Sequence, residues 1–354
     1  MSIPYDRYHV NKLETGSASG QCSAPQRRSL PLPDFSAGLG LLTSPAVLFF
    51  FVGAGAAFAR SDLSIPEQVA KALSLYLMLC IGFKGGVEAR AAGLDGDFLS
   101  AGALGLVLSA LMPLLAFGLL KWTRLDRPTV CALAATYGSV SVVTFAAGQQ
   151  HLASLGLAPG GYMAAVLALM ETPAILTGLI LMNGAGSDQR TDRGTVLKEV
   201  LVGAATVILL GSFLVGAISG EAGMQKLDLF VNPLFQGALC FFLLDLGLNA
   251  ARSLMAGGRK LNVPVVAFAL GFPVISAALA LGLARLAGLE VGDAALLAIL
   301  AGSASYIAVP AAMRVAAPKA DPGIFVTASL ALTFPFNLTF GIALYTAAAT
   351  WLWT

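Results

Sequence analysis

Long apolar runs separated by short polar breaks fill the sequence from about residue 40 onward. Each run has roughly twenty residues, which is the length at which an α-helix crosses the hydrocarbon core of a bilayer. Gly138, Pro173 and Pro335 lie inside such runs, where neighbouring membrane helices can satisfy the backbone groups that they free. The pattern predicts about ten transmembrane helices, near residues 41–59, 67–89, 98–120, 130–151, 161–183, 199–219, 233–254, 263–284, 293–313 and 323–352.

The composition excludes an ordinary soluble protein. Of the 354 residues, 57% are hydrophobic and only 11% are charged, which is too few to cover a solvated surface. The formal net charge is +2, and no basic patch is interleaved with aromatic residues, so we expect no nucleic-acid partner. We expect an all-α, polytopic membrane protein.

Three motifs occur twice in the same order, at separations of 164, 165 and 162 residues. Such a fixed spacing indicates an internal duplication. Because five helices per copy is an odd number, the second copy enters the membrane from the opposite side and the repeats are inverted. The paired motifs are 138–147 with 302–311, 81–84 with 246–249, and 173–177 with 335–339.

This duplication sets the expected organisation of the chain. Residues 1–38 are polar and predict a flexible N-terminal tail, and residues 184–198 predict a cytoplasmic linker. The first repeat then spans 39–183 and the second spans 199–354. Basic residues crowd the loops of one side, which is therefore cytoplasmic, and both termini lie outside the cytoplasm. That side carries Arg60, Lys121, Arg124, Arg127, Arg190, Arg193, Lys198, Arg252, Arg259, Lys260, Arg314 and Lys319, against Arg90, Lys226 and Arg285 on the other when the N-terminal tail is left out.

The first duplicated motif is small and hydroxylated at the centre of the fourth and ninth predicted helices. Such a stretch can break a membrane helix and present free N–H groups to a cavity, so both helices are expected to be discontinuous. The hydroxyl of Tyr306 either donates to an anion or belongs to a ring that only packs. The candidate substrate-binding residues are Gly138, Ser139, Ser141, Thr144, Gly302, Ser303, Ser305 and Tyr306.

Few charges lie within the apolar runs, and each needs a reason because a charge is costly in a membrane. Glu171 either binds a cation or is protonated and hydrogen-bonds a neighbouring helix. Asp245 either binds an ion or pairs with Lys84 of the sister motif. Glu171, Asp245 and Thr144 are thus the candidate ion-binding residues. No metal-ligand spacing and no catalytic motif occurs, so we expect no metal site, no catalytic residue, no cofactor and no enzymatic activity.

Taken together, the motifs resemble the sodium-dependent bicarbonate transporter family first known from cyanobacteria. They are the segments 81–86, 138–141, 170–174, 232–235 and 303–310, and the likeness covers roughly residues 40 to 350. The resemblance implies an inner-membrane symporter of Na⁺ and bicarbonate, with an elevator-like core that holds the two broken helices. It also implies a scaffold built from the first two helices of each repeat, a homotrimer, and a PII-like cytoplasmic regulator.

The sequence departs from the cyanobacterial pattern inside both breaks. It carries Val142 and Val143 where those members have a Gly-Ser pair, and Tyr306 where they have an Asp. Sodium coupling is therefore expected to be weaker here. Two further interpretations remain open: sodium-coupled transport of another small organic anion, and a membrane sensor that binds a ligand without transporting it.

Overall fold

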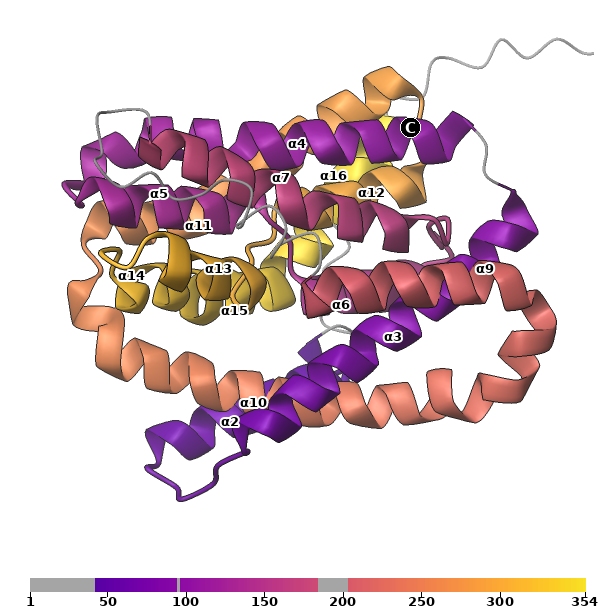
Figure 1. The fold of residues 1–354 in the computed structure, drawn as a ribbon, viewed down its shortest axis with the longest axis horizontal. Coiled ribbons are helices and arrows are strands. Elements are labelled where there is room, and N and C mark those ends of the chain that lie inside the picture. The colour runs from indigo at the N-terminus through magenta and orange to yellow at the C-terminus, as the bar shows by residue number, and fades with distance from the viewer. Residues whose placement is uncertain (1–41, 94–95, 184–202) are drawn as a thin grey trace, which may run out of the picture. The chain divides into compact units, whose positions relative to one another are not determined.

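The computed structural model describes residues 42–93, 96–183 and 203–354, and every regular element in these ranges is a helix (Figure 1). Within them, eight helical stretches are long and apolar enough to cross a membrane. Two shorter apolar helices, Pro45–Phe58 and Val291–Ala301, lie where the first and ninth spans are predicted. The expected N-terminal tail and cytoplasmic linker lie outside the described residues.

Where they fall on described residues, the predicted spans overlap helices of the structure. The helices of the first half are α2 (Pro45–Phe58), α3 (Glu67–Ala92), α4 (Gly96–Leu120), α5 (Arg127–Gly138), α6 (Val142–Ser154) and α7 (Met163–Asn183). Those of the second half are α9 (Ala204–Val231), α10 (Pro233–Gly257), α11 (Val263–Ala287), α12 (Val291–Ala301), α13 (Ala308–Ala316), α14 (Pro322–Val326), α15 (Phe334–Phe336) and α16 (Ile342–Trp353). Two π-helical stretches, Thr327–Thr333 and Asn337–Gly341, connect the last three.

Several helices begin with the same local signal, a polar cap followed by proline. The Asp126 carboxylate accepts from the amide of Thr129 at 3.2 Å, and the Asn262 side chain accepts from the amide of Val265 at 3.0 Å. Proline follows in the first turn of both α5 and α11, where its missing N–H costs nothing. Short-range sequence therefore fixes where these helices begin.

The second half departs from the prediction after residue 219. The sequence there is polar and suggested a break. The backbone is indeed non-helical at Gly220, whose φ is +57°, but a second helical part of α9 follows and ends at Val231. Arg90 of α3 packs against this glycine, and its guanidinium donates to the Ala217 carbonyl at 3.1 Å. A cation is favourable at that position because the carbonyls at the end of a helix carry partial negative charge.

The helices form two groups according to how they pack. We call α2, α3, α9 and α10 the four-helix group, in which α2 packs on α10 and α3 packs on α9. We call the remaining helices the main bundle. A Cβ at Gly247 would lie 2.0 Å from the Phe50 carbonyl oxygen, and one at Gly82 would lie 2.4 Å from that of Leu209. These two glycines, which occupy corresponding places in the duplicated motifs, permit both close helix crossings.

Corresponding polar contacts hold the loops of the main bundle. In the first turn of α5, the Thr129 hydroxyl accepts from the amide of Asp321 at 2.9 Å. In the first turn of α12, the Asp293 carboxylate accepts from the amide of Gly160 at 2.7 Å. Asp321 also accepts from Lys260 at 2.7 Å, and this ammonium holds the pKa of Asp321 below its usual value. Each loop is therefore fastened to the start of a broken helix.

Candidate functional site

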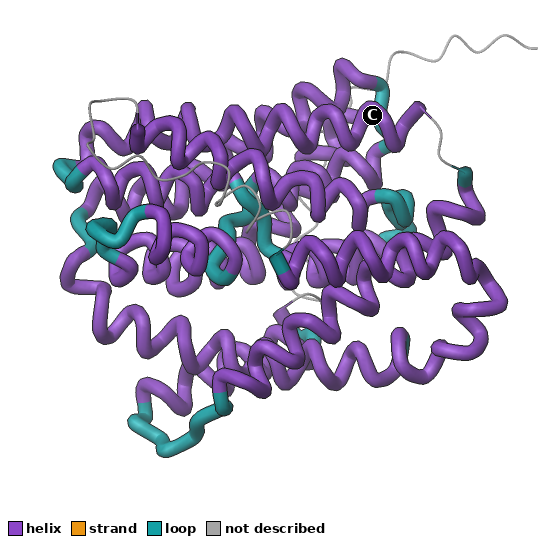
Figure 2. The backbone as a smooth tube through the Cα atoms, in the orientation of Figure 1, coloured by secondary structure: helices purple, strands orange, loops and turns teal. Residues whose placement is uncertain are grey.

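The two discontinuous helices cross at their breaks. Helix α5 ends at Gly138 and α6 begins at Val142, while α12 ends at Ala301 and α13 begins at Ala308 (Figure 2). The amide of Ser141 donates to the Ser303 hydroxyl at 3.0 Å, and the amide of Ser305 donates to the Thr136 carbonyl at 2.9 Å. Backbone groups that each break frees are thus satisfied by the other break.

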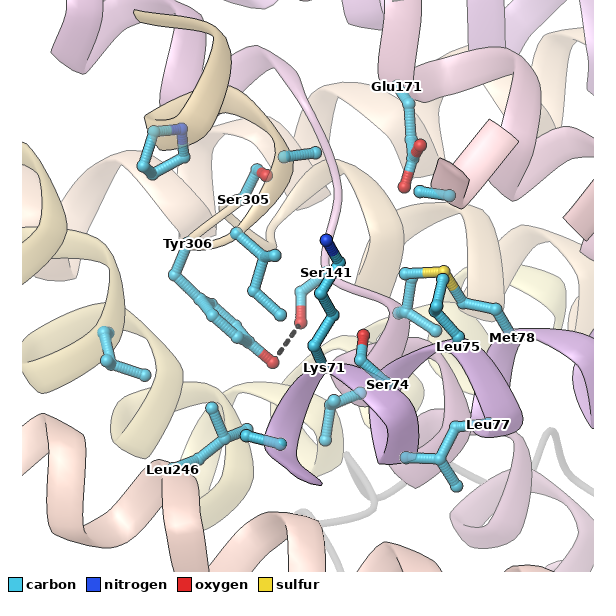
Figure 3. Close-up of a pocket in the computed structure, with 18 of the residues that line it drawn as sticks. Lys71, Ser74, Leu75, Leu77, Met78, Ser141, Glu171, Leu246, Ser305 and Tyr306 are labelled. Atoms are coloured by element: carbon cyan, nitrogen blue, oxygen red, sulfur yellow. Dashed lines mark hydrogen bonds between the residues drawn. The ribbon is translucent and has the colours of Figure 1, made fainter. Parts of the chain in front are cut away.

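The hydroxyl of Ser141 is the centre of a small polar network. It accepts from the amide of Thr144 at 3.1 Å and from the Thr144 hydroxyl at 3.0 Å, which caps α6. It also lies 3.3 Å from the hydroxyl of Tyr306 across the junction (Figure 3). The Tyr306 ring packs edge-on against Phe334, with centroids 5.2 Å apart. Tyr306 therefore both packs and presents its hydroxyl at the junction.

Both glycines of the duplicated motif are held by close packing. A Cβ at Gly138 would lie 2.3 Å from the ring of Pro113, and one at Gly302 would lie 2.9 Å from the ring of Tyr345. The Gly302 carbonyl accepts from the Asn337 amide at 2.8 Å, and the Tyr345 hydroxyl donates to Asn337 at 3.0 Å. The small residues at these positions thus place the breaks against the neighbouring helices.

A cavity of about 830 Å³ ends at this junction. It lies between the two groups of helices, and α3, α7, α9 and α10 contribute to its wall (Figure 3). Ser141, Ser305 and Tyr306 line it, together with both candidate carboxylates. The other predicted substrate residues, Gly138, Ser139, Thr144, Gly302 and Ser303, lie behind this lining, where all five are almost fully buried.

The cavity extends toward the loops that are rich in basic residues. Glu67 and Lys71 at the start of α3 line it there, with Gly203 at the start of α9 and Ser253 near the end of α10. Toward the other side the two groups of helices are in contact. A Cβ at Gly85 of α3 would lie 2.6 Å from the Gly161 carbonyl.

A polar contact lies on that closed side as well. The Gln150 amide of α6 donates to the Gln236 side chain of α10 at 3.0 Å. Because α6 belongs to the main bundle and α10 to the four-helix group, this bond also joins the two groups. The cavity therefore reaches the side with the basic loops, and contacts between the two groups of helices lie on the other side.

The two candidate ion-binding carboxylates have different surroundings. Glu171 is 4% exposed and points into the cavity, and no hydrogen bond or ion pair to its carboxylate is found in the described ranges (Figure 3). Asp245 is held by its own helix, because the Asn249 amide donates to it at 3.0 Å. Lys84, its suggested partner, instead lies 5.9 Å from the ring centroid of Phe235.

Sequence reasoning missed three residues around the site. Asn337 of the second π-helical stretch and Tyr345 of α16 support the second break, and Lys71 lines the cavity. The lysine carried a readable signal, since a charge one turn inside an apolar span needs a partner or an aqueous surface. Asn337 lies in the duplicated segment 335–339, but its contact with the break depends on how α16 and the π-helical stretches pack.

The structure has helices of membrane length, and two broken helices cross at the end of a cavity. This arrangement is typical of membrane transport proteins. The family model of the Na⁺-dependent bicarbonate transporter superfamily matches residues 45–350, and the chain belongs to this family. A comparison with curated proteins gives no match.

Proposed function

We propose that the protein is a secondary transporter that carries bicarbonate, or an anion of similar size, across the cell inner membrane together with Na⁺. The observation that carries the proposal is the cavity, which ends where the two broken helices cross. Ser141, Ser305 and Tyr306 are the proposed substrate contacts. The N-terminal ends of α6 and α13, which begin at the breaks, supply partial positive charge for an anion.

Transport in this proposal proceeds by movement of the main bundle against the four-helix group. Corresponding contacts in the two halves support an inverted repeat of five plus five helices, in particular Gly82 with Gly247 and Thr129 with Asp293. An inverted repeat allows the two halves to exchange conformations, which converts access from one side into access from the other. The structure would then be the state open to the cytoplasm, with both termini outside the cytoplasm.

Family membership also leads us to propose a homotrimer and a PII-like regulator that binds at the cytoplasmic side. Mass photometry of the detergent-solubilised protein tests the trimer. Co-purification with candidate PII-like proteins, in the presence and absence of adenine nucleotides, tests the proposed regulator.

Uptake of radiolabelled bicarbonate into proteoliposomes tests the main proposal. An inward Na⁺ gradient should drive accumulation, and replacement of Na⁺ by choline should reduce it. Liposomes without protein provide the control. Uptake equal to that of protein-free liposomes under every gradient would contradict the proposal.

A second candidate substrate is a small organic anion. A cavity of about 830 Å³ lies in the range of sites for larger organic ligands, and Leu75, Met78 and Phe242 contribute apolar surface to it. Competition separates the candidates: unlabelled acetate, pyruvate or a larger carboxylate should inhibit labelled uptake only if it binds the same site.

A further inference from the structure

We propose that Lys71 is an anion-binding residue of the cavity, where its ammonium group holds the transported anion on the side open to the basic loops. This inference rests on the function proposed above and adds a specific residue to it. The cavity wall carries several carboxylates, which repel a negative substrate. The helix ends at the breaks do not by themselves account for how an anion stays there, and a cationic side chain does.

Helix α3 presents one face to the cavity. Glu67, Lys71, Ser74 and Met78 follow one another at helical spacing and all line it. Such spacing places side chains on the same face of a helix. Lys71 is solvent-exposed and extends into the cavity (Figure 3). Its ammonium group is therefore available to a ligand in the cavity.

The charges around the cavity explain why a cation is needed. Glu67, Glu171 and Asp245 contribute three carboxylates to the lining. Lys71 is the cationic side chain among the described lining residues, and the one ion pair found in the described ranges joins Lys260 to Asp321. Carboxylates in a poorly screened space repel an anion, and Lys71 is the charged group among the described lining residues that attracts one.

Arg252 does not replace Lys71 in this role. Its guanidinium donates to the Leu63 carbonyl at 2.6 Å, and the residue is not part of the cavity wall. The ammonium of Lys71 offers three donors on a flexible stem of methylene groups. It suits an oxyanion such as bicarbonate or a small carboxylate, because charge-assisted hydrogen bonds form with either.

Exchange of labelled bicarbonate across proteoliposomes tests this inference in the full-length protein. The variants are Lys71→Gln, which removes the charge, and Lys71→Arg, which keeps it. Lys226→Gln is the matched control, since Lys226 is exposed on α9 outside the cavity. We expect Lys71→Gln to raise the half-saturating bicarbonate concentration by about tenfold or more, as loss of one charge-assisted bond would. Lys71→Arg and Lys226→Gln should stay close to the wild type.

The outcomes separate this inference from the function on which it rests. If the wild type exchanges bicarbonate and Lys71→Gln does so with the same half-saturation, Lys71 binds no anion and the proposed function stands. If the wild type exchanges neither bicarbonate nor any small carboxylate, both are overturned. Equal elution of all variants in size-exclusion chromatography excludes misfolding as the cause of a loss, and an impaired Lys71→Arg variant with normal elution would contradict a charge-based role.

Discussion

The amide nitrogen of Ser141 donates a hydrogen bond of 3.0 Å to the hydroxyl oxygen of Ser303, and this bond joins the two broken helices. Both residues are almost completely buried. Ser303 in turn donates to the Leu300 carbonyl at 2.7 Å, so its hydroxyl satisfies one group from each half of the chain. The position of the first break consequently depends on a side chain in the second.

Replacing Ser303 with alanine should therefore destabilise the junction. The variant leaves the Ser141 amide without its acceptor, and an unpaired buried donor costs about 1–3 kcal/mol. Ser139→Ala is the matched control, because the Ser139 hydroxyl is buried and has no hydrogen-bond partner within the described part of the chain. Thermal unfolding in detergent should show a lower Tm for Ser303→Ala than for Ser139→Ala. Equal midpoints would mean that the bond contributes nothing to stability.

The pairing of these breaks could be predicted from sequence, whereas the direction in which their side chains face could not. Repetition of Gly-Ser stretches is visible along the chain and indicates two equivalent breaks. That Ser141 lines the cavity while Ser139 and Ser303 lie behind it depends on how the segments twist after the helices end. Local sequence does not specify that twist.

The helix positions could also be predicted from sequence, except for the segment after Gly220. An apolar run of membrane length determines a helix almost by itself, because unpaired backbone groups cannot exist in lipid. The segment after Gly220 contains Glu221, Lys226 and Asp228, so hydropathy alone suggested a loop. This segment is helical in the structure, but it has no apolar run from which a helix could be predicted. Lys71 stands one turn inside an apolar span and could have been singled out, but its place in the cavity wall arises only when the helices assemble.

Close helix crossings in the four-helix group should not tolerate an added methyl group. Gly247→Ala would place a Cβ 2.0 Å from the Phe50 carbonyl oxygen, and because backbone atoms cannot yield, α2 and α10 must separate. Overpacking of this kind typically costs about 1–3 kcal/mol. Gly237→Ala on the same helix is the control, since a Cβ at Gly237 would have no neighbouring atom within 4 Å among the described residues. A Gly247→Ala protein with the wild-type Tm would show that the crossing adapts at no cost.

Linking the two groups of helices on the closed side should stop transport. Gln150 and Gln236 are in direct contact there, at 3.0 Å between side-chain atoms. Cysteines at both positions, in a background with the four native cysteines replaced by alanine, can be joined by a short bis-methanethiosulfonate linker. We expect the linker to block bicarbonate uptake and dithiothreitol to restore it.

Cysteines at Tyr76 and Phe230 provide the control for this experiment. Their rings lie 4.9 Å apart and join α3 to α9, both within the four-helix group. A linker at that place should leave uptake largely unchanged, because it does not connect groups that move relative to each other. Full uptake by the linked Gln150 and Gln236 variant would contradict the proposed movement of the main bundle.

Glu171 should determine how strongly transport depends on sodium. Its carboxylate faces the cavity without a hydrogen bond or ion pair in the described ranges, and an unbalanced charge within a membrane is costly. A transported Na⁺ would supply the missing charge when it binds. Glu171→Gln should thus raise the Na⁺ concentration for half-maximal bicarbonate uptake or abolish the dependence. Glu67→Gln serves as the control, because Glu67 lines the same cavity but is exposed to solvent.

The same pair of variants decides between the two interpretations of this carboxyl group. If Glu171 is protonated throughout transport and only supports its neighbours, glutamine reproduces its shape and neutral charge, and the sodium curve stays that of the wild type. If it binds the cation, glutamine offers one carbonyl oxygen in place of a charged carboxylate and binds Na⁺ more weakly. A shifted curve for Glu171→Gln beside an unshifted one for Glu67→Gln places the coupling ion at Glu171. Equal shifts in both would instead indicate that sodium responds to the overall charge of the cavity.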